Sequence, residues 1–488
     1  MTLRSREAVL FSASWLLASV TGLNDEDGIC VEQRHAAGAL RVIDTVAREL
    51  MLFAAVGLLI GGLDDLAVDL VFWTRRLLGK RRPLTLATLP DASPMRFAIL
   101  VPTWDEAPVI GAMLTTMLQR FGPGDYRVFV GVYPNDPATA VAVRAIADER
   151  VTVVVGSRSG PTTKAANLNQ IWRALIDARW APDAVIIHDA EDLVHAAELR
   201  VFAALLAEHD VVQLPVLPIV DRGSPLLSGH YADEFSEMHS RSMAVRAAVG
   251  AGMPLAGTGC AIRFERLVGV AARRWGDPFD ADSLTEDYEL GLHLAQQGAS
   301  GCLARVREKP GGPMVAVRAI FPGELDAAVR QKARWMTGIA LAGWDRTGWA
   351  RPLALGDHWM RVRDRRAPLA MLVLAAAYLA VLAWALSAAV HWFGGTSSPA
   401  LSPTLGTLLT INMLLLTWRL LMRMVFTGRA YGWREALWSL PRFLVGNAVT
   451  LMAAPRALLL YLRLLRGGAP TWDKTAHVFP DLAPVEQP

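Results

Sequence analysis

The chain has 488 residues, more than one ordinary domain contains, and 53% of them are hydrophobic whereas only 19% are charged. This balance is apolar for a soluble protein and predicts membrane helices beside a globular part. The net charge of +3 argues against a general nucleic-acid binder, and three cysteines without a CxxC pair argue against a disulfide framework or a thiolate metal site.

The N-terminal part contains one credible membrane span. Residues 1–48 form an N-terminal extension whose apolar run at 8–20 is too short to cross a bilayer; it could be a signal-peptide core, an extra helix or part of a longer extension. The span covers residues 49–75 and is interrupted by Asp64, Asp65 and Asp69. We expect these acids near the interface of a tilted helix, in preference to a transport role. The basic run at 75–82 predicts a cytoplasmic end.

Between residues 83 and 360 the pattern changes to short apolar strands that alternate with helical stretches. The predicted strands are residues 97–101, 128–132, 151–155, 184–187 and 261–264. This βαβ series predicts a mainly parallel, Rossmann-like sheet. The expected fold class is therefore α/β, with membrane helices before and after it in the chain.

The C-terminal part returns to the membrane. Residues 367–390 and 401–419 are two further spans, and the arginines at both outer ends of this hairpin predict that those ends are cytoplasmic. Residues 433–488 are predicted to form interfacial helices and a C-terminal tail, because prolines and arginines interrupt the apolar stretch at 437–465. A fourth span is the alternative for that stretch.

Residues 184–198, with the sequence AVIIHDAEDLVHAAE, join a buried strand to a cluster of acids. Asp189 and Glu191 follow the strand directly, and ligands bind outside the carboxyl ends of strands in open α/β sheets. Carboxylate oxygens suit a divalent cation such as Mg²⁺ or Mn²⁺, with substrate phosphates completing its shell. The alternative is a solvated acidic turn that caps the next helix.

Polar loops follow the other predicted strands and should reach the same edge of the sheet. The first loop contains Thr103 and Glu106, and the second contains Asp136. Acidic side chains there can accept hydrogen bonds from a nucleobase or ribose, whereas ordinary turn chemistry is the alternative. Lys164 lies in the first turn of a helix, where free N–H groups already attract phosphate, although a surface lysine is common. The glycines at 257 and 259 would let the backbone approach a ligand closely.

Two later segments carry further candidates. In DSLTEDYEL, Asp287 is a candidate general base aimed at an acceptor hydroxyl, although helix dipoles favour acids at a helix start in any case. In QKARW, one helix face is shared by Gln331, Arg334 and Trp335. Arginine can pair with a diphosphate and tryptophan can stack on a sugar, whereas an interfacial helix with a basic face is the alternative.

Taken in order, these segments resemble the family 2 glycosyltransferases over residues 96–349, in particular the membrane-integrated, cellulose-synthase-like branch. The resemblance assigns Asp136 to nucleotide binding, Lys164 to the diphosphate, and Asp189-Ala190-Glu191 to the metal-binding DxD motif with Glu in the second acidic place. TED at 285–287 would hold the base, and QKARW would bind the diphosphate and the acceptor. GLDDL, HDAED, LTEDYELG and WDKTAH carry a closer resemblance to the NfrB-like branch, whose members are inner-membrane transferases linked to an exported polysaccharide.

The resemblance implies a cytosolic domain of GT-A type. It would transfer a sugar from a nucleotide-sugar donor, expected to be a UDP-sugar, to a growing glycan or exopolysaccharide by an inverting, metal-dependent displacement. Asp287 would be the catalytic base, and Asp189 and Glu191 would hold Mg²⁺ or Mn²⁺. The expected substrate-binding residues are Thr103, Glu106, Asp136, Lys164, Glu286, Gln331, Arg334 and Trp335.

The expected location is the bacterial inner membrane, with several spans, contacts to membrane lipid, and outer-membrane or export proteins as partners but no nucleic acid. The alternative is a catalytically inactive scaffold or receptor component of a polysaccharide secretion system. Donor hydrolysis by the purified protein would separate the two.

Overall fold

The computed structural model describes residues 26–79 and 84–470. It divides into two compact units, one made of residues 26–60 and Leu372–Asn412, and the other of Gly61–Met371 and the chain from Met413 onward. We call these the helical unit and the sheet unit. The apolar run at 8–20, the basic residues at 80–82 and the WDKTAH motif lie outside the described residues.

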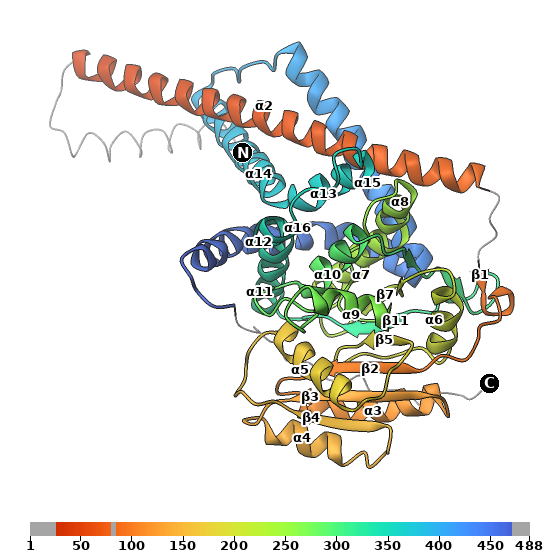
Figure 1. The fold of residues 1–488 in the computed structure, drawn as a ribbon. Coiled ribbons are helices and arrows are strands. Elements are labelled where there is room, and N and C mark those ends of the chain that lie inside the picture. Colours follow the sequence, from red (N-terminus) through yellow and green to blue (C-terminus); the bar gives the residue numbers. More distant parts are fainter. Residues whose placement is uncertain (1–25, 80–83, 471–488) are drawn as a thin grey trace. The chain divides into compact units, whose positions relative to one another are not determined.

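The sheet unit is organised around a seven-stranded sheet (Figure 1). In spatial order its strands are β4 (Val151–Val155), β3 (Tyr126–Val132), β2 (Phe97–Pro102), β5 (Ala184–Ile187), β8 (Cys260–Arg263), β6 (Val211–Gln213) and β9 (Gly301–Leu303). The first four are parallel, and β8 runs antiparallel to both of its neighbours. The prediction of an α/β fold with a mainly parallel sheet is confirmed.

Helices cover both faces of this sheet because successive side chains of its strands point to opposite sides. In β2, Ile99 and Val101 belong to the core beneath α3 (Ala107–Phe121), α4 (Pro137–Arg144) and α6 (Glu198–Leu206). Ala98 and Leu100 belong to the opposite core, beneath α5 (Lys164–Asp177), α9 (Phe264–Ala272) and α10 (Glu286–Gln296). All four side chains are fully buried, as a strand enclosed on both faces requires.

Smaller elements complete the sheet unit. Two parallel pairs of strands stand apart from the main sheet: β1 (Leu84–Thr85) with β10 (Val306–Arg307), and β7 (Val216–Ile219) with β11 (Val317–Ile320). A short 3₁₀ turn, η1 (Leu86–Thr88), follows β1. The remaining helices and π-helical segments are α7 (Leu227–Glu237), η2 (Met238–Ser242), α8 (Met243–Ala248), α11 (Leu325–Met336), η3 (Thr337–Leu341), α12 (Ala342–Thr347) and α13 (Leu355–Arg365).

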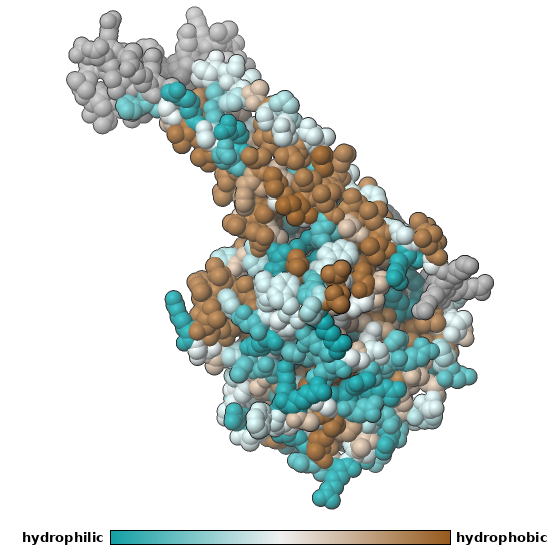
Figure 2. Space-filling model, turned by 45° about the horizontal axis from the view of Figure 1, so that its top comes forward, coloured by the Kyte–Doolittle hydropathy of each residue, from teal (hydrophilic) through white to brown (hydrophobic). Residues whose placement is uncertain are grey.

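Four long helices of the described chain are long and apolar enough to cross a membrane. They are α2 (Glu26–Leu78), α14 (Ala367–Gly394), α15 (Pro403–Tyr431) and α16 (Trp433–Leu465). Many of their apolar side chains are exposed, among them Leu382, Trp384 and Phe393 of α14, as a lipid-facing surface requires; Figure 2 shows exposed apolar residues in brown. The helix α2 begins well before the predicted start at residue 49, because residues 26–48 contain no proline and continue the helical pattern.

The segment predicted to form interfacial helices is one continuous helix, α16, which runs through Pro441 and Pro455. Its length and composition also suit a fourth span, so the interfacial position stays a prediction. Its small or β-branched residues Val449, Ala453 and Ala457 are fully buried in the core that it shares with α7 and α11.

The acids that interrupt α2 pair with arginines of the sheet unit. Asp65 accepts hydrogen bonds from Arg363 and Arg366, each at 2.8 Å, and Asp69 accepts one from Arg241 at 2.6 Å. These partners explain how an otherwise apolar helix tolerates carboxylates.

The helical unit contains its own polar contacts among long helices. Asp44 of α2 accepts hydrogen bonds from Ser387 of α14 at 2.5 Å and from His391 at 3.2 Å. Asn412 of α15 donates to the carbonyl of Ala55 at 2.8 Å. Such inter-helical hydrogen bonds are typical of helices that pack in a bilayer.

Candidate active site

The topology of the sheet brings several candidate loops to one edge. The strands β2, β3 and β5 are parallel neighbours, so the loops after Pro102, Val132 and Ile187 leave from the same side. The antiparallel strand β8 has the opposite direction, and its first residue, Cys260, pairs with Ile187. The glycine loop before β8 therefore reaches the edge that the parallel strands reach with their carboxyl ends.

Lys164 is the residue through which these loops meet. It is the first residue of α5, whose start is capped by Thr163, which accepts a hydrogen bond from the N–H of Ala166 at 3.1 Å. Its ammonium group donates to a carboxylate oxygen of Asp189 and, at 3.0 Å, to the carbonyl of Gly257. Three segments far apart in the sequence are thus joined at one cation.

The charges around Lys164 determine its ionisation. Burial alone would lower the pKa of its ammonium group, but the carboxylates of Asp189, Glu286 and Asp287 outweigh burial and raise that pKa. Lys164 is therefore a permanent positive charge at the start of a helix, the position where a phosphate group is best stabilised.

The acids after β5 lie close enough to raise one another's pKa. Burial raises the pKa of Glu191 well above its ordinary value, and the neighbouring carboxylates of Asp189, Glu106 and Asp192 raise it further. A site that holds several carboxylates this close favours an added cation, which would restore their ionised form.

A buried histidine behind this loop was not singled out from the sequence. His188 is fully buried, and its two ring nitrogens lie 3.0 Å from Asp192 and 2.6 Å from Glu198. Burial lowers the pKa of this imidazole, but Glu198 and Asp192 outweigh it and raise the pKa to about 10, so His188 is a cation. Asp192 also accepts hydrogen bonds from the hydroxyl of Thr258 and from the N–H of Asp189, at 2.9 Å for the latter. This network supports the backbone that carries Asp189.

Asp287 and Glu286 occupy the first turn of α10 and face the same cation. Burial raises the pKa of both carboxyl groups, that of Glu286 to about 7, and Lys164 and Arg334 oppose the shift. Gly257 makes this arrangement possible: its φ is +77°, and a Cβ there would lie 2.6 Å from a carboxylate oxygen of Asp287 and 3.2 Å from the Lys164 ammonium. Only glycine fits this position without displacing either group.

The QKARW segment lies on α11, as predicted from its helical pattern. The Gln331 side-chain oxygen and the Arg334 Nε atom are buried and have no hydrogen-bond partner, so both are available to a ligand. Trp335 is partly buried and packs among Tyr231, Phe235 and Phe321, with ring centroids 6.0 to 6.1 Å apart. Its predicted stacking on a sugar stays a prediction.

The nucleotide-side candidates support the loops on which they lie. The carboxylate of Asp136 caps α4 by accepting from the N–H of Thr139 at 3.3 Å, and it accepts from the N–H of Asp105 at 2.7 Å. Thr103 is fully buried and donates its hydroxyl proton to the carbonyl of Gly131 at 2.7 Å. These contacts match the alternative of turn chemistry, and a contact to a nucleotide stays a prediction for both.

A metal ion at this edge would need ligands beyond the protein. Within residues 26–79 and 84–470, no three His, Cys, Asp or Glu side chains are grouped in a way that could hold a metal ion. Asp189 and Glu191 offer hard carboxylate oxygen atoms beside other acids, which fits a divalent cation that shares its shell with phosphate oxygens. The residues present therefore fit such an ion in a substrate-bound site.

Comparisons with known proteins agree with this architecture. A family model described as "Glycosyltransferase like family 2" matches residues 94–338. The chain is 34% identical over 465 residues to bacteriophage adsorption protein B of Escherichia coli K12 and equally to bacteriophage N4 adsorption protein B of Escherichia coli O157:H7. Each match covers 88% of this chain and only 62% of the relative's length.

A solved structure has the same fold. A mannosyltransferase from Pyrobaculum calidifontis, determined in complex with GDP-Man and Mn²⁺, superposes with a TM-score of 0.50 at 19% identity, covering 84% of this chain and 99% of that one. This likeness shows that the sheet and its helices have the GT-A architecture.

Proposed function

Because the chain belongs to the family 2 glycosyltransferases and has their GT-A fold, we propose that it transfers a sugar from a nucleotide-sugar donor, a UDP-sugar, to a growing glycan or exopolysaccharide. The reaction is an inverting displacement in which the acceptor hydroxyl attacks the anomeric carbon from the side opposite the leaving diphosphate.

The observation that carries this proposal is the junction at Lys164. A permanent cation at the start of α5 lies against Asp189 and Gly257 and within the field of Asp287. This combination supports the proposal that Lys164 binds phosphate, that Asp189 binds a cation and that Asp287 is the base of one site. A purely structural ion pair would not require a glycine at 257 to make room for Asp287.

Asp189 and Glu191 would hold the divalent ion, Mg²⁺ or Mn²⁺. When bound, the ion supplies positive charge that stabilises the diphosphate as the bond to the sugar breaks. Lys164 and Arg334 supply charge of the same sign from the protein, and Arg334 brings an Nε–H with no partner of its own. Preorganised charge of this kind is commonly the largest contribution in transfers with a charged leaving group.

Asp287 acts as the general base. Its carboxylate removes the proton of the acceptor hydroxyl while the oxygen forms a bond to the anomeric carbon. The bond between that carbon and the diphosphate oxygen breaks, and its electron pair leaves with the nucleoside diphosphate. The raised pKa of Asp287 suits this task, because a carboxylate of ordinary pKa is a weak base at neutral pH.

The location that we propose is the bacterial inner membrane, with the sheet unit in the cytoplasm, where nucleotide sugars are made. Arginines lie at the ends of the long helices that adjoin the sheet unit, for example Arg75 and Arg76 in α2 and Arg429 in α15. The relatives' name, bacteriophage adsorption protein B, supports a product exposed at the cell surface and made with outer-membrane or export partners.

The test is a screen of nucleotide sugars with the purified full chain in detergent or nanodiscs, with Mn²⁺, Mg²⁺ or EDTA. We expect nucleoside diphosphate release with a divalent ion and its loss in EDTA. Asp287→Asn should lower turnover by about 10²- to 10⁴-fold while donor binding is retained, because that is the usual contribution of a general base.

The matched control is Asp282→Asn, an exposed aspartate of the same loop. It should retain wild-type turnover. Normal turnover in Asp287→Asn would refute the assignment of the base, and the absence of release with every donor would refute the proposed activity.

A further inference from the structure

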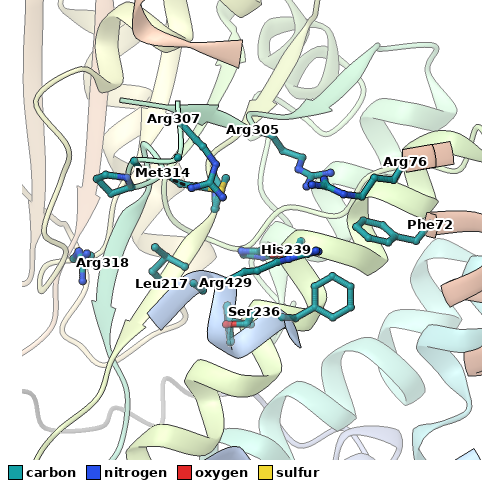
Figure 3. A pocket seen from close by; sticks show the side chains of 18 residues that line it. Phe72, Arg76, Leu217, Ser236, His239, Arg305, Arg307, Met314, Arg318 and Arg429 are labelled. Atoms are coloured by element: carbon teal, nitrogen blue, oxygen red, sulfur yellow. Dashed lines mark hydrogen bonds between the residues drawn. The ribbon is translucent and has the colours of Figure 1, made fainter. Parts of the chain in front are cut away.

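A cavity in the sheet unit is lined by none of the residues assigned to the active site. It has a volume of about 320 Å³ and is lined by 18 residues (Figure 3). They come from the ends of α2, α7 and α15, from η2, from β11, from β7 and the residue before it, and from the 305–314 segment. Its apolar lining includes Phe72 and Phe426. The volume lies at the lower end of the range for small-molecule sites.

The charged residues that line this cavity are all positive. Five of its lining residues are arginines and none is acidic: Arg76, Arg305, Arg307, Arg318 and Arg429. Figure 3 shows the guanidinium groups of Arg76 and Arg305 turned toward each other. Across the described part of the chain, none of the five makes an ion pair, whereas the acids of neighbouring α2 and α7 pair with other arginines. We call this group the arginine pocket.

The mutual repulsion in the arginine pocket is visible in Arg305. Burial lowers the pKa of its guanidinium, and the positive charges of Arg76, Arg307 and Arg429 lower it further. Neighbouring like charges destabilise the protein unless an anion lies between them. The absence of an acidic residue in the lining points to a ligand that brings the negative charge.

A buried hydrogen-bond donor also faces the arginine pocket. His239, in the π-helical segment η2, is 2% exposed and lines the cavity. Its Nδ1 accepts from the N–H of Val216 at 2.8 Å, so Nε2 carries the proton, and Nε2 has no partner. Burial lowers the pKa of His239 to about 4, which keeps the ring neutral with a single N–H to offer. Unused buried donors are rare and commonly have a ligand.

We propose that the arginine pocket binds an anion that carries phosphate groups. Guanidinium groups pair with phosphate oxygens in a bidentate way, and the His239 Nε2–H supplies a further donor for an acceptor oxygen. Because α2 and α15 are candidate membrane spans, the phosphate could belong to a lipid headgroup or to a soluble compound. The chemistry of recognition is the same for both.

The experiment uses the full chain in two arms, with EDTA present to suppress metal-dependent binding at the active site. In the first, inorganic pyrophosphate is titrated calorimetrically into protein in phosphatidylcholine nanodiscs. In the second, native mass spectrometry counts phosphatidic acid molecules retained by the protein from mixed micelles. Binding in the first arm identifies a soluble ligand, and retention in the second alone identifies a lipid.

The variant Arg305→Gln/Arg429→Gln should weaken the observed binding by about tenfold or more, because each charge-assisted hydrogen bond contributes that much. The matched control, Arg144→Gln/Arg273→Gln, removes the same charge from exposed arginines elsewhere and should bind as the wild type does. Arg76→Gln, on a different element, should repeat the selective loss. The proposal is overturned if neither probe binds, if the first variant binds normally, or if the control loses binding equally.

Discussion

Gly257 offers the sharpest test of the active-site geometry, through the substitution Gly257→Ala. Its φ of +77° costs a non-glycine residue about 1–2 kcal/mol, and the new Cβ would lie 2.6 Å from a carboxylate oxygen of Asp287. Ordinary contact begins at 3.4 Å, so the carboxylate would have to move by roughly 0.8 Å. A misplacement of about 1 Å at a reacting group costs on the order of 10²-fold in rate.

Gly250→Ala is the matched control for this change. Gly250 has a φ of +71° and no atom within 4 Å of the position of a Cβ, so it carries the same backbone strain without the collision. Thermal unfolding should show a similar loss of stability in both variants, whereas nucleoside diphosphate release should fall about 10²-fold only in Gly257→Ala. Equal activity in the two variants would refute the view that Gly257 leaves room for the base.

Two further predictions follow from buried charge. Asp287 must be ionised to act as a base and its pKa is raised, so kcat/KM should fall as the pH drops through that pKa. The variant Glu286→Gln removes a neighbouring negative charge and should therefore move this fall to lower pH. An unchanged pH profile in the variant would contradict the reasoning. His188→Ala leaves two buried carboxylates without their partner, so the free energy of unfolding should fall by about 3–5 kcal/mol in thermal unfolding. The control His195→Ala changes a partly exposed pair and should lower it by less than about 1 kcal/mol. Similar losses in the two variants would argue against the buried network.

The strands and their order along the chain could be predicted from local pattern. The ranges 151–155 and 184–187 agree residue for residue with β4 and β5, because both are runs of apolar or β-branched residues between polar loops; β5 is buried throughout, whereas β4 is a partly exposed edge strand. The convergence of Lys164 and Asp189 followed from the rule that parallel strands present their carboxyl ends at one edge.

The contacts that could not be predicted join residues far apart in the sequence. The approach of Gly257 to Lys164 depends on β8 entering the sheet antiparallel, and no local signal gives that direction. The pairing of His188 with Glu198 involves a residue that the sequence presents only as one more acid after a strand. The arginine pocket was missed for the same reason, since its arginines are distributed from α2 to α15.

The acids of α2 pair with arginines that lie some 300 residues later in the chain, and this affects when the helix can reach its final position during synthesis. Asp64 contacts Arg363, and the two are separated by 299 residues. At a synthesis rate of roughly 5–20 residues per second, the ribosome needs about 15–60 s to supply that partner. During this interval the nascent helix holds carboxylates that only the translocation machinery or lipid headgroups can shield, so its final placement is expected to be completed late in translation.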